Sequence, residues 1–461
     1  MNSSNALAND DPREILNASA MSRLQYLVVA MTVALNALDG FDVMAISFAS
    51  PGIAAEWQTT MAGLGLILSM ELWGMAVGSI FLGGVADLLG RRPTILGCLL
   101  LMTAGMFMVT TTDSLVVLST WRFITGLGIG GMLAAINAQA AEFSNNRNRA
   151  FAIAIMAAGY PIGGVVGGLV VSQLLKTFDW RSVFYFGTAM TALMIPLVYF
   201  IMPESVHWLV RKRPAGALER INATMAKLGH AATSLLPDLR SEANRKAWID
   251  IFSKAMLPIT LIVTVSYFLH IVTFYYILKW VPKLVVDMGF SPSSAGGVLT
   301  WASVGGALGC FTFGYLTKHF DVKKLTLFFF VCSWIATVLF GQATADLTVL
   351  SALVGIAGYF INSGIVGMYS LVAQVFPTHV RASGTGFAIG VGRGGSVLSP
   401  IVAGILLQGG MTLPILSLIM GTGSMLAFTA LVWLQRGGGG SAGGKVKDEP
   451  KVVDGLSPTR A

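Results

Sequence analysis

The amino-acid sequence predicts an all-α integral membrane protein with twelve transmembrane helices, arranged as two pseudo-symmetric six-helix bundles. Three observations lead to this fold: the composition, the spacing of apolar blocks and an internal duplication. The 461 residues are 54% hydrophobic and only 11% charged, whereas about 25% of the residues in a soluble domain are charged. Apolar and polar residues do not alternate over strand-length segments, which argues against a membrane β-barrel.

The apolar residues fall into twelve blocks, each long enough to cross a hydrocarbon core about 30 Å thick. The blocks are approximately 24–48, 61–86, 94–111, 115–141, 150–175, 182–202, 256–281, 295–317, 325–343, 347–373, 382–407 and 411–434. Residues 1–22 do not resemble a cleavable signal peptide. The predicted units are a cytoplasmic segment 1–22, an N-terminal bundle 23–202, a cytoplasmic loop 203–255, a C-terminal bundle 256–435 and a flexible cytoplasmic tail 436–461.

The basic residues predict the orientation of the chain in the membrane. One alternate set of short loops holds Arg91, Arg92, Arg147, Arg149, Lys318, Lys323, Lys324 and Arg381. The opposite loops hold little beyond Lys176, Arg181 and Lys283. This positive-inside pattern places both termini in the cytoplasm, and we expect a multi-pass protein of a cell membrane, in bacteria the inner membrane. The net charge of +8 is thereby explained without a nucleic-acid partner.

The two halves repeat one pattern. Ala141-Glu142 is followed by Arg149-Ala150, and Ala373-Gln374 is followed by Arg381-Ala382 at the same spacing, with an offset of 232. Pro51 and Pro282, which we expect to end the first and seventh blocks, differ by 231, and Gly84 and Gly314 differ by 230. Such duplication is typical of transporters, whose site lies between the halves.

Signals of catalysis are missing from the sequence. Cys98, Cys310 and Cys332 fall in separate apolar blocks without paired spacing, as expected of buried small hydrophobic residues. There is neither a His/Cys/Asp cluster with ligand spacing nor a P-loop. We therefore expect no enzyme, no cofactor and no metal, and the long loop is too short for a receptor domain.

Several motifs resemble those of one family. GGVADLLGRR (83–92) is similar to the loop signature of the major facilitator superfamily, and RFITGLGIGG (122–131) resembles its fourth-helix motif. GYPIGGVVGG (159–168), PESVHWL (203–209) and FPTHVRASGTG (376–386) match further elements. DGFD (39–42) resembles the first helix of the aromatic acid:proton symporter branch. The resemblance covers residues 23–435 and implies a twelve-helix transporter that works without a cofactor.

The loop signature predicts a gate on the cytoplasmic side. Asp87 stands next to Arg91 and Arg92 at a helix start, where a carboxylate can meet backbone donors and the helix dipole. The residues expected to form this gate are Gly83, Asp87, Gly90, Arg91, Arg92, Glu142 and Arg149. Leu88 stands where the family often has arginine, and the second copy has Thr317 in place of the acid. Alternatively, Asp87 is a satisfied turn acid with no gating role.

Few ionisable residues lie deep in the apolar blocks, and such groups are functional candidates. They are the acids Asp39, Asp42 and Glu71, the bases Arg122 and Arg393, and His270. At 1.5 Å per residue, Asp42, Asp39 and Arg122 share a layer roughly 10–15 Å below the outer helix ends, and Arg393 lies near the midplane. We expect Lys279 to extend to the outer surface and to have no role.

These residues predict a site with two sides. Asp39, Asp42 and Glu71 are candidates for proton coupling, since carboxylates bind and release protons. Arg393 is the candidate anchor for a substrate carboxylate, because arginine offers a permanent charge and a bidentate fork. The other substrate candidates are Arg122, His270, Tyr267, Phe274, Tyr275 and Tyr359, whose rings suit a flat aromatic molecule.

Each assignment has a structural alternative. Asp42 and Arg122 could form a purely structural ion pair, Glu71 could bond neighbouring helices, His270 could be a neutral core residue, and the tyrosines could simply pack.

The sequence therefore predicts a monomeric secondary transporter that imports a small aromatic carboxylate together with protons. Benzoate, hydroxybenzoates, protocatechuate and vanillate all fit. A proton-driven efflux antiporter and an importer of a non-aromatic organic acid remain as alternatives, because residue types do not reveal the direction of coupling.

Overall fold

The computed structural model describes residues 11–236, 250–254, 256–377 and 380–437. Within this part of the chain, twelve helical segments are long and apolar enough to cross a membrane, as predicted. The first six are α3 (Arg23–Trp57), α4 (Met61–Leu89), α5 (Arg91–Thr110), α6 (Leu115–Glu142), α7 (Arg149–Leu174) and α8 (Arg181–Ile201). The second six are α12 (Leu257–Asp287), α13 (Pro292–Leu316), α14 (Val322–Gly341), α15 (Leu347–Val375), the pair α16 (Arg381–Gly392) and α17 (Gly394–Gln408), and α18 (Leu413–Gly437). The predicted flexible tail lies almost entirely outside the described residues.

The two halves pack in the same way, as the duplication predicts. In the first bundle, α3 packs on α7, α4 on α6, and α5 on α6 and α8; in the second, α12 packs on α17, α13 on α15, and α14 on α15 and α18. One expectation was wrong: Pro51 and Pro282 do not end their helices, which continue to Trp57 and Asp287. Neighbouring helices bury both segments and compensate for the backbone bond that proline removes.

Glycines set the close approach of helices in the first bundle. A Cβ on Gly163 would stand 1.7 Å from the carbonyl oxygen of Ala37, and one on Gly159 would stand 2.5 Å from that of Val33. The glycines of α4 do the same against α6, where a Cβ on Gly74 would stand 2.1 Å from the carbonyl oxygen of Phe123. Helices in lipid associate largely through such backbone contact. The glycine periodicity in the sequence thus predicts these interfaces.

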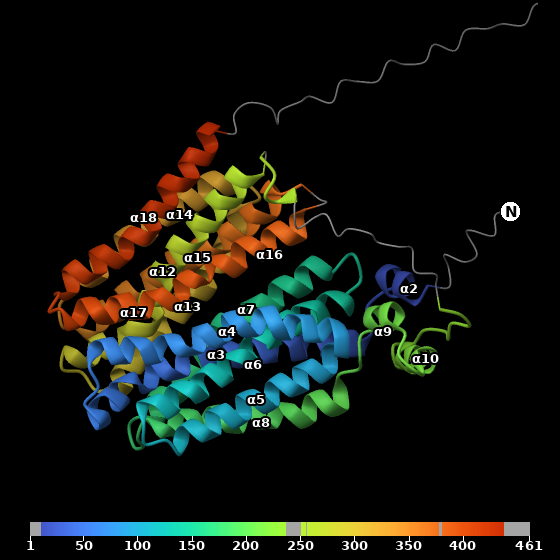
Figure 1. Cartoon of the computed structure of the whole chain (residues 1–461), viewed down its shortest axis with the longest axis horizontal. Helices are drawn as coiled ribbons and strands as arrows, with labels where there is room; N and C mark the ends of the chain where they lie inside the picture. Colours follow the sequence, from blue (N-terminus) through green and yellow to red (C-terminus); the bar gives the residue numbers. More distant parts are fainter. Residues whose placement is uncertain (1–10, 237–249, 255, 378–379, 438–461) are drawn as a thin grey trace, which may run out of the picture.

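The bundles meet mainly through two helix pairs, α4 with α17 and α7 with α13. The backbone amide of Ala62 donates to Gln408, and Ser293 donates to the carbonyl of Ser172. Both contacts lie at the start of one helix and the end of the other, far from α2 (Pro12–Ala18), α9 (Val206–Lys212) and α10 (Ala217–Lys227). We call this the closed end; toward the opposite end the bundles spread apart (Figure 1).

The short helices α2, α9 and α10 attach to the first bundle. Leu16, Trp208, Ile221 and other buried residues form their common apolar core. Arg149 at the start of α7 donates to the side chain of Asn17 at 2.5 Å. The first part of the predicted loop 203–255 is therefore an ordered helical platform; residues 237–249 of that loop are outside the described part.

Replacing Gly163 by alanine should destabilise the protein, because the new methyl group meets the α3 backbone. We expect a loss of about 1–3 kcal/mol of unfolding free energy, the usual effect of overpacking, seen as a lower melting temperature of the purified protein. Gly97→Ala on α5 is the control, since nothing lies within 4 Å of its added Cβ. Equal melting temperatures for the two variants would contradict the packing described here.

Candidate functional site

A buried ion pair joins α4 and α6 in the first bundle. The guanidinium of Arg122 lies 2.5 Å from the carboxylate of Glu71, and both side chains are 0% exposed. Arg122 also donates to the backbone carbonyl of Asp42 at 2.9 Å and to the sulfur of Met106 at 3.1 Å, and it packs on the ring of Phe184. The Asp42–Arg122 ion pair, considered as a structural alternative, is therefore not formed. Glu71 bonds neighbouring helices, as the alternative for this residue supposed.

The two acids of DGFD are buried without partners. Asp39 is 2% exposed and Asp42 is 0% exposed. Within the described residues, none of their four carboxylate oxygens has a hydrogen-bond partner. A buried charge is costly unless it is paired, so these carboxyl groups suit proton binding. Gly40 between them lets α7 approach, since a Cβ there would meet the Tyr160 carbonyl at 2.0 Å.

Lys279 was assigned wrongly from the sequence. Its side chain is 0% exposed and does not extend to the outer surface. The ammonium lies 3.4 Å from Glu71 and donates to the backbone carbonyl of Val43, so it crosses from α12 to the first bundle. The available signal was the length of α12, which continues eight residues beyond Lys279, about 12 Å of helix. Our expected helix end at Pro282 concealed this depth.

Arg393 lies at the junction of α16 and α17, in the second bundle. Its neighbours on either side are glycines: a Cβ on Gly392 would stand 2.2 Å from the ring of Tyr267, and one on Gly395 would stand 2.2 Å from the carbonyl of Phe268. The glycines therefore hold Arg393 against α12. Among the described residues, no carboxylate lies within ion-pair distance of its guanidinium.

Phenol rings from three helices surround Arg393. Tyr267, Tyr275, Tyr369 and Tyr160 lie close enough to interact with it electrostatically. The hydroxyls of Tyr267 and Tyr369 are 3.1 Å apart, and Phe274 packs edge-on against Tyr275 at 4.9 Å between centroids. Tyr160 comes from α7 of the first bundle and was missed by the sequence analysis, because only the fold brings it opposite α12.

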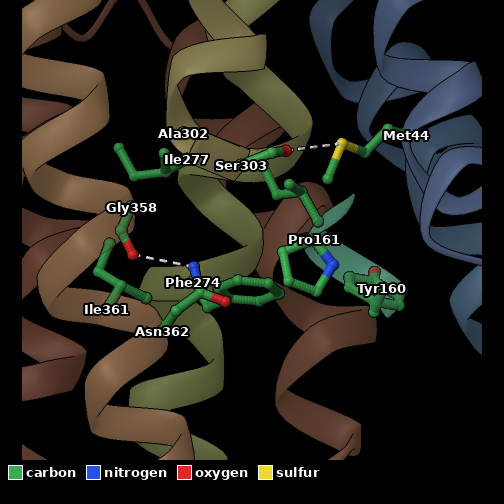
Figure 2. Close-up of a pocket in the computed structure, with 11 residues that line it drawn as sticks. Met44, Tyr160, Pro161, Phe274, Ile277, Ala302, Ser303, Gly358, Ile361 and Asn362 are labelled. Atoms are coloured by element: carbon green, nitrogen blue, oxygen red, sulfur yellow. Dashed lines mark hydrogen bonds between the residues drawn. The ribbon is translucent and has the colours of Figure 1, made fainter. Parts of the chain in front are cut away.

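A small cavity of about 20 Å³ lies between the bundles next to Tyr160 and Phe274. The first bundle contributes Met44, Tyr160 and Pro161, and the second contributes Phe274, Ile277, Leu278, Ala302, Ser303, Gly358, Ile361 and Asn362 (Figure 2). The side-chain amide of Asn362 donates to the Gly358 carbonyl at 2.9 Å. Asn362, Ser303 and Met44 carry no sequence signal that separates them from packing residues.

Of the substrate candidates, only Phe274 lines this cavity among the described residues, and His270 and Tyr359 are engaged elsewhere. His270 is 0% exposed, its Nε2 donates to the Ile361 carbonyl at 2.9 Å, and its Nδ1 lies 2.9 Å from the hydroxyl of Ser424. A carbonyl can only accept, so this arrangement fits a neutral tautomer held inside the second bundle. Tyr359 packs with Phe329 and Phe360 instead of facing Arg393. His270 therefore fits the alternative of a neutral core residue, and Tyr359 fits the alternative of a packing residue.

The loop signature forms a charge network. Arg91 joins Asp87 at 2.7 Å and Glu142 at 3.1 Å, which connects α4, α5 and α6. Glu204 accepts from the backbone amides of Arg91 at 2.9 Å and Ser205 at 2.8 Å. Burial raises the pKa of Glu204, while these amides oppose that shift.

Glycine is required at position 90 of this network. Gly90 has a φ of +116°, and a Cβ there would stand 2.3 Å from Glu204. The remaining gate candidates lie nearby: Arg92 donates to the Tyr199 carbonyl, Arg149 donates to that of Ala141 at 3.1 Å, and a Cβ on Gly83 would stand 3.5 Å from the Cβ of Ala134. Each of these contacts lies within the first bundle.

Comparison with known proteins agrees with this architecture. The 4-hydroxybenzoate transporter PcaK of Pseudomonas aeruginosa is 28% identical over 404 residues, covering 86% of this chain and 89% of the relative. The gallate transporter of Pseudomonas putida is 26% identical over 430 residues, covering 92% and 94%. The inward open conformation of the xylose transporter XylE from E. coli superposes with a TM-score of 0.71 at 17% identity, covering 88% and 96%.

The family profile described as Major Facilitator Superfamily matches residues 32–340 and 263–453, which together span most of the sequence. The match includes both bundles and every candidate site residue described above. The loop signature and the twelve-helix arrangement, first noted as a resemblance, are thereby confirmed. The chain belongs to the Major Facilitator Superfamily.

Proposed function

We propose that this protein imports a small aromatic carboxylate together with protons, by alternating access across a bacterial inner membrane. The observation that carries the proposal is Arg393, a fixed cation without a carboxylate partner among the described residues, placed near four tyrosines, of which Tyr160 also lines the cavity between the bundles. A guanidinium in such a place requires an anion, and a planar carboxylate matches its fork. Relatives named for 4-hydroxybenzoate and gallate support an aromatic acid.

The unpartnered acids supply the coupling. Asp39 and Asp42 lie in the first bundle, while Arg393 belongs to the second. An empty Arg393 and ionised acids disfavour closure of the bundles over a dry cavity, because each charge would be buried unpaired. A bound anion together with protons on the acids removes both obstacles. Substrate and protons then cross in the same step.

The charge network of Asp87, Arg91 and Glu142 belongs to the end where the bundles spread apart. With the proposed orientation this is the cytoplasmic end. The network fixes the relative positions of α4, α5 and α6, and we assign it the gating role on that side. Because its contacts remain within one bundle here, it remains intact while the cytoplasmic end is open.

Orientation can be tested with single cysteines in a cysteine-free background. Ser114, before α6, and Ala226, on α10, are both exposed and lie at opposite ends of the bundles. We expect Ser114→Cys to react with an impermeant thiol reagent in intact cells, and Ala226→Cys to react only after the cells are opened. Reaction of Ala226→Cys from outside would overturn the orientation.

Removing the charge of the first-helix acids should uncouple transport. We expect Asp39→Asn and Asp42→Asn each to abolish uptake driven by a pH gradient, while at least one variant retains substrate binding or exchange. Both changes preserve size, and neither carboxylate has a hydrogen-bond partner to lose within the described residues. Normal gradient-driven accumulation in the double variant would exclude these acids from coupling.

The anchor role of Arg393 predicts a change in ligand preference. Wild type should bind 4-hydroxybenzoate far better than 4-hydroxybenzamide, because a neutral amide leaves the guanidinium underpaired. Arg393→Lys should weaken binding of the acid, and Arg393→Ala should nearly remove it and reduce the acid-to-amide ratio at least tenfold. Binding of both ligands is measured by calorimetry on purified protein.

The exposed Arg211 on α9 provides the control, and Arg211→Ala should retain the wild-type ratio. Melting temperature and elution volume show whether each variant is folded. A folded Arg393→Ala protein with an unchanged acid-to-amide ratio would disprove the anchor.

A further inference from the structure

Lys279 is a buried cation whose contacts lie across the interface between the bundles. It belongs to α12 of the second bundle, yet its ammonium contacts Glu71 on α4 and the Val43 carbonyl on α3. All three residues are 0% exposed. No partner from its own bundle is present among the described residues. The other lysine of this helix segment, Lys283, behaves differently and pairs with Asp287 one turn along α12.

Lys279 lies in the part of α12 that is nearer the closed end. The helix pairs α4–α17 and α7–α13 meet at that end, and Lys279 lies in the part of α12 that continues toward it. A buried ammonium is stable only with an ionised or strongly accepting partner. Separation of the bundles at this end would take Lys279 away from both of its partners. Their presence therefore favours the closed arrangement.

Glu71 links Lys279 to the acids of the first helix. One carboxylate oxygen, Oε2, is 2.5 Å from Arg122 and 3.4 Å from Lys279, while Oε1 has no partner within the described part of the chain. Arg122 in turn donates to the backbone of Asp42. One carboxylate thus contacts cations from both bundles, and its negative charge is required for the contact between them.

We propose that Lys279 is an inter-bundle lock, which holds the end far from α2, α9 and α10 closed by pairing with ionised Glu71. The cation supplied by the second bundle joins the Glu71–Arg122 pair of the first bundle through Glu71 Oε2. Loss of the positive charge at 279, or of the negative charge at 71, releases that end. This inference extends the proposed transport cycle but does not need its substrate or its direction.

The test measures exposure of the closed end in purified protein, without substrate or transport. Cys98, Cys310 and Cys332 are replaced by alanine, and Thr300→Cys serves as the reporter. Thr300 is 5% exposed, and its hydroxyl oxygen would stand 2.2 Å from a Cβ on Gly168 across the α7–α13 contact. A charged maleimide therefore reaches this position only when the closed end opens.

We expect slow modification in the parent and at least a tenfold faster reaction in Lys279→Met. Lys283→Met is the matched control, one turn further along α12 with its partner on the same helix, and should react at the parent rate. Lys279→Gln is the second variant, because its amide can still donate to the Val43 carbonyl while the charge is lost. It should also react faster.

Glu71→Gln tests the partner. We expect it to open the closed end as Lys279→Met does, and the double variant to react no faster than the faster single variant, because the two residues act as one unit. Slow modification in folded Lys279→Met and Lys279→Gln proteins would overturn the lock. Independent, multiplying effects of the two sites would also overturn it. A protein that opens as expected but fails to bind aromatic acids would refute the proposed function and leave the lock standing.

Discussion

The ion pair between Glu71 and Arg122 is the interaction on which the interior of this protein depends. Both groups are removed from water, and breaking such a pair by removing one partner typically costs about 3–5 kcal/mol. The pair fixes α4 against α6 and directs a further guanidinium donor to the α3 backbone at Asp42. Because Arg122 is occupied in this way, the carboxyl groups of Asp39 and Asp42 have no hydrogen-bond or ion-pair partner among the described residues. These two carboxyl groups can bind protons because Arg122 pairs with Glu71 and not with them.

The fold could be predicted almost completely from the sequence, because lipid imposes strong rules. Twelve long apolar segments, glycines such as Gly74 and Gly163 at helix contacts, and the repeat offset all reflect requirements that act along the chain. Pairing partners could not be predicted in the same way. Asp42 and Arg122 share a depth, but depth does not specify rotation about the helix axis, and Glu71 faces the guanidinium instead. Helices α3 and α4 both carry carboxylates that could pair with Arg122, and the packing of the helices decides which one does.

The same limit explains Lys279, His270 and Tyr160. A sequence gives no sign that a lysine of one bundle meets a glutamate 208 positions earlier in the other. His270 stands in the second half where Asp39 stands in the first, yet Ser424 and the Ile361 carbonyl satisfy both of its nitrogens. The duplication preserves positions, whereas the chemistry has diverged. Acids collect in one bundle, and an arginine surrounded by tyrosines occupies the other.

Because α9 and α10 are attached to the first bundle, a protein that binds these helices from outside would follow the movement of that bundle. Trp208 donates to the backbone of Asp87, and Glu204 accepts from the backbone amides at the start of α5, so this platform is joined to the helices it covers. An antibody fragment bound to α10 would therefore move with the first bundle as one body. It would add mass and shape for cryo-electron microscopy without bridging the two bundles. A binder on this platform would therefore fix the first bundle and leave the second bundle free to rotate relative to it.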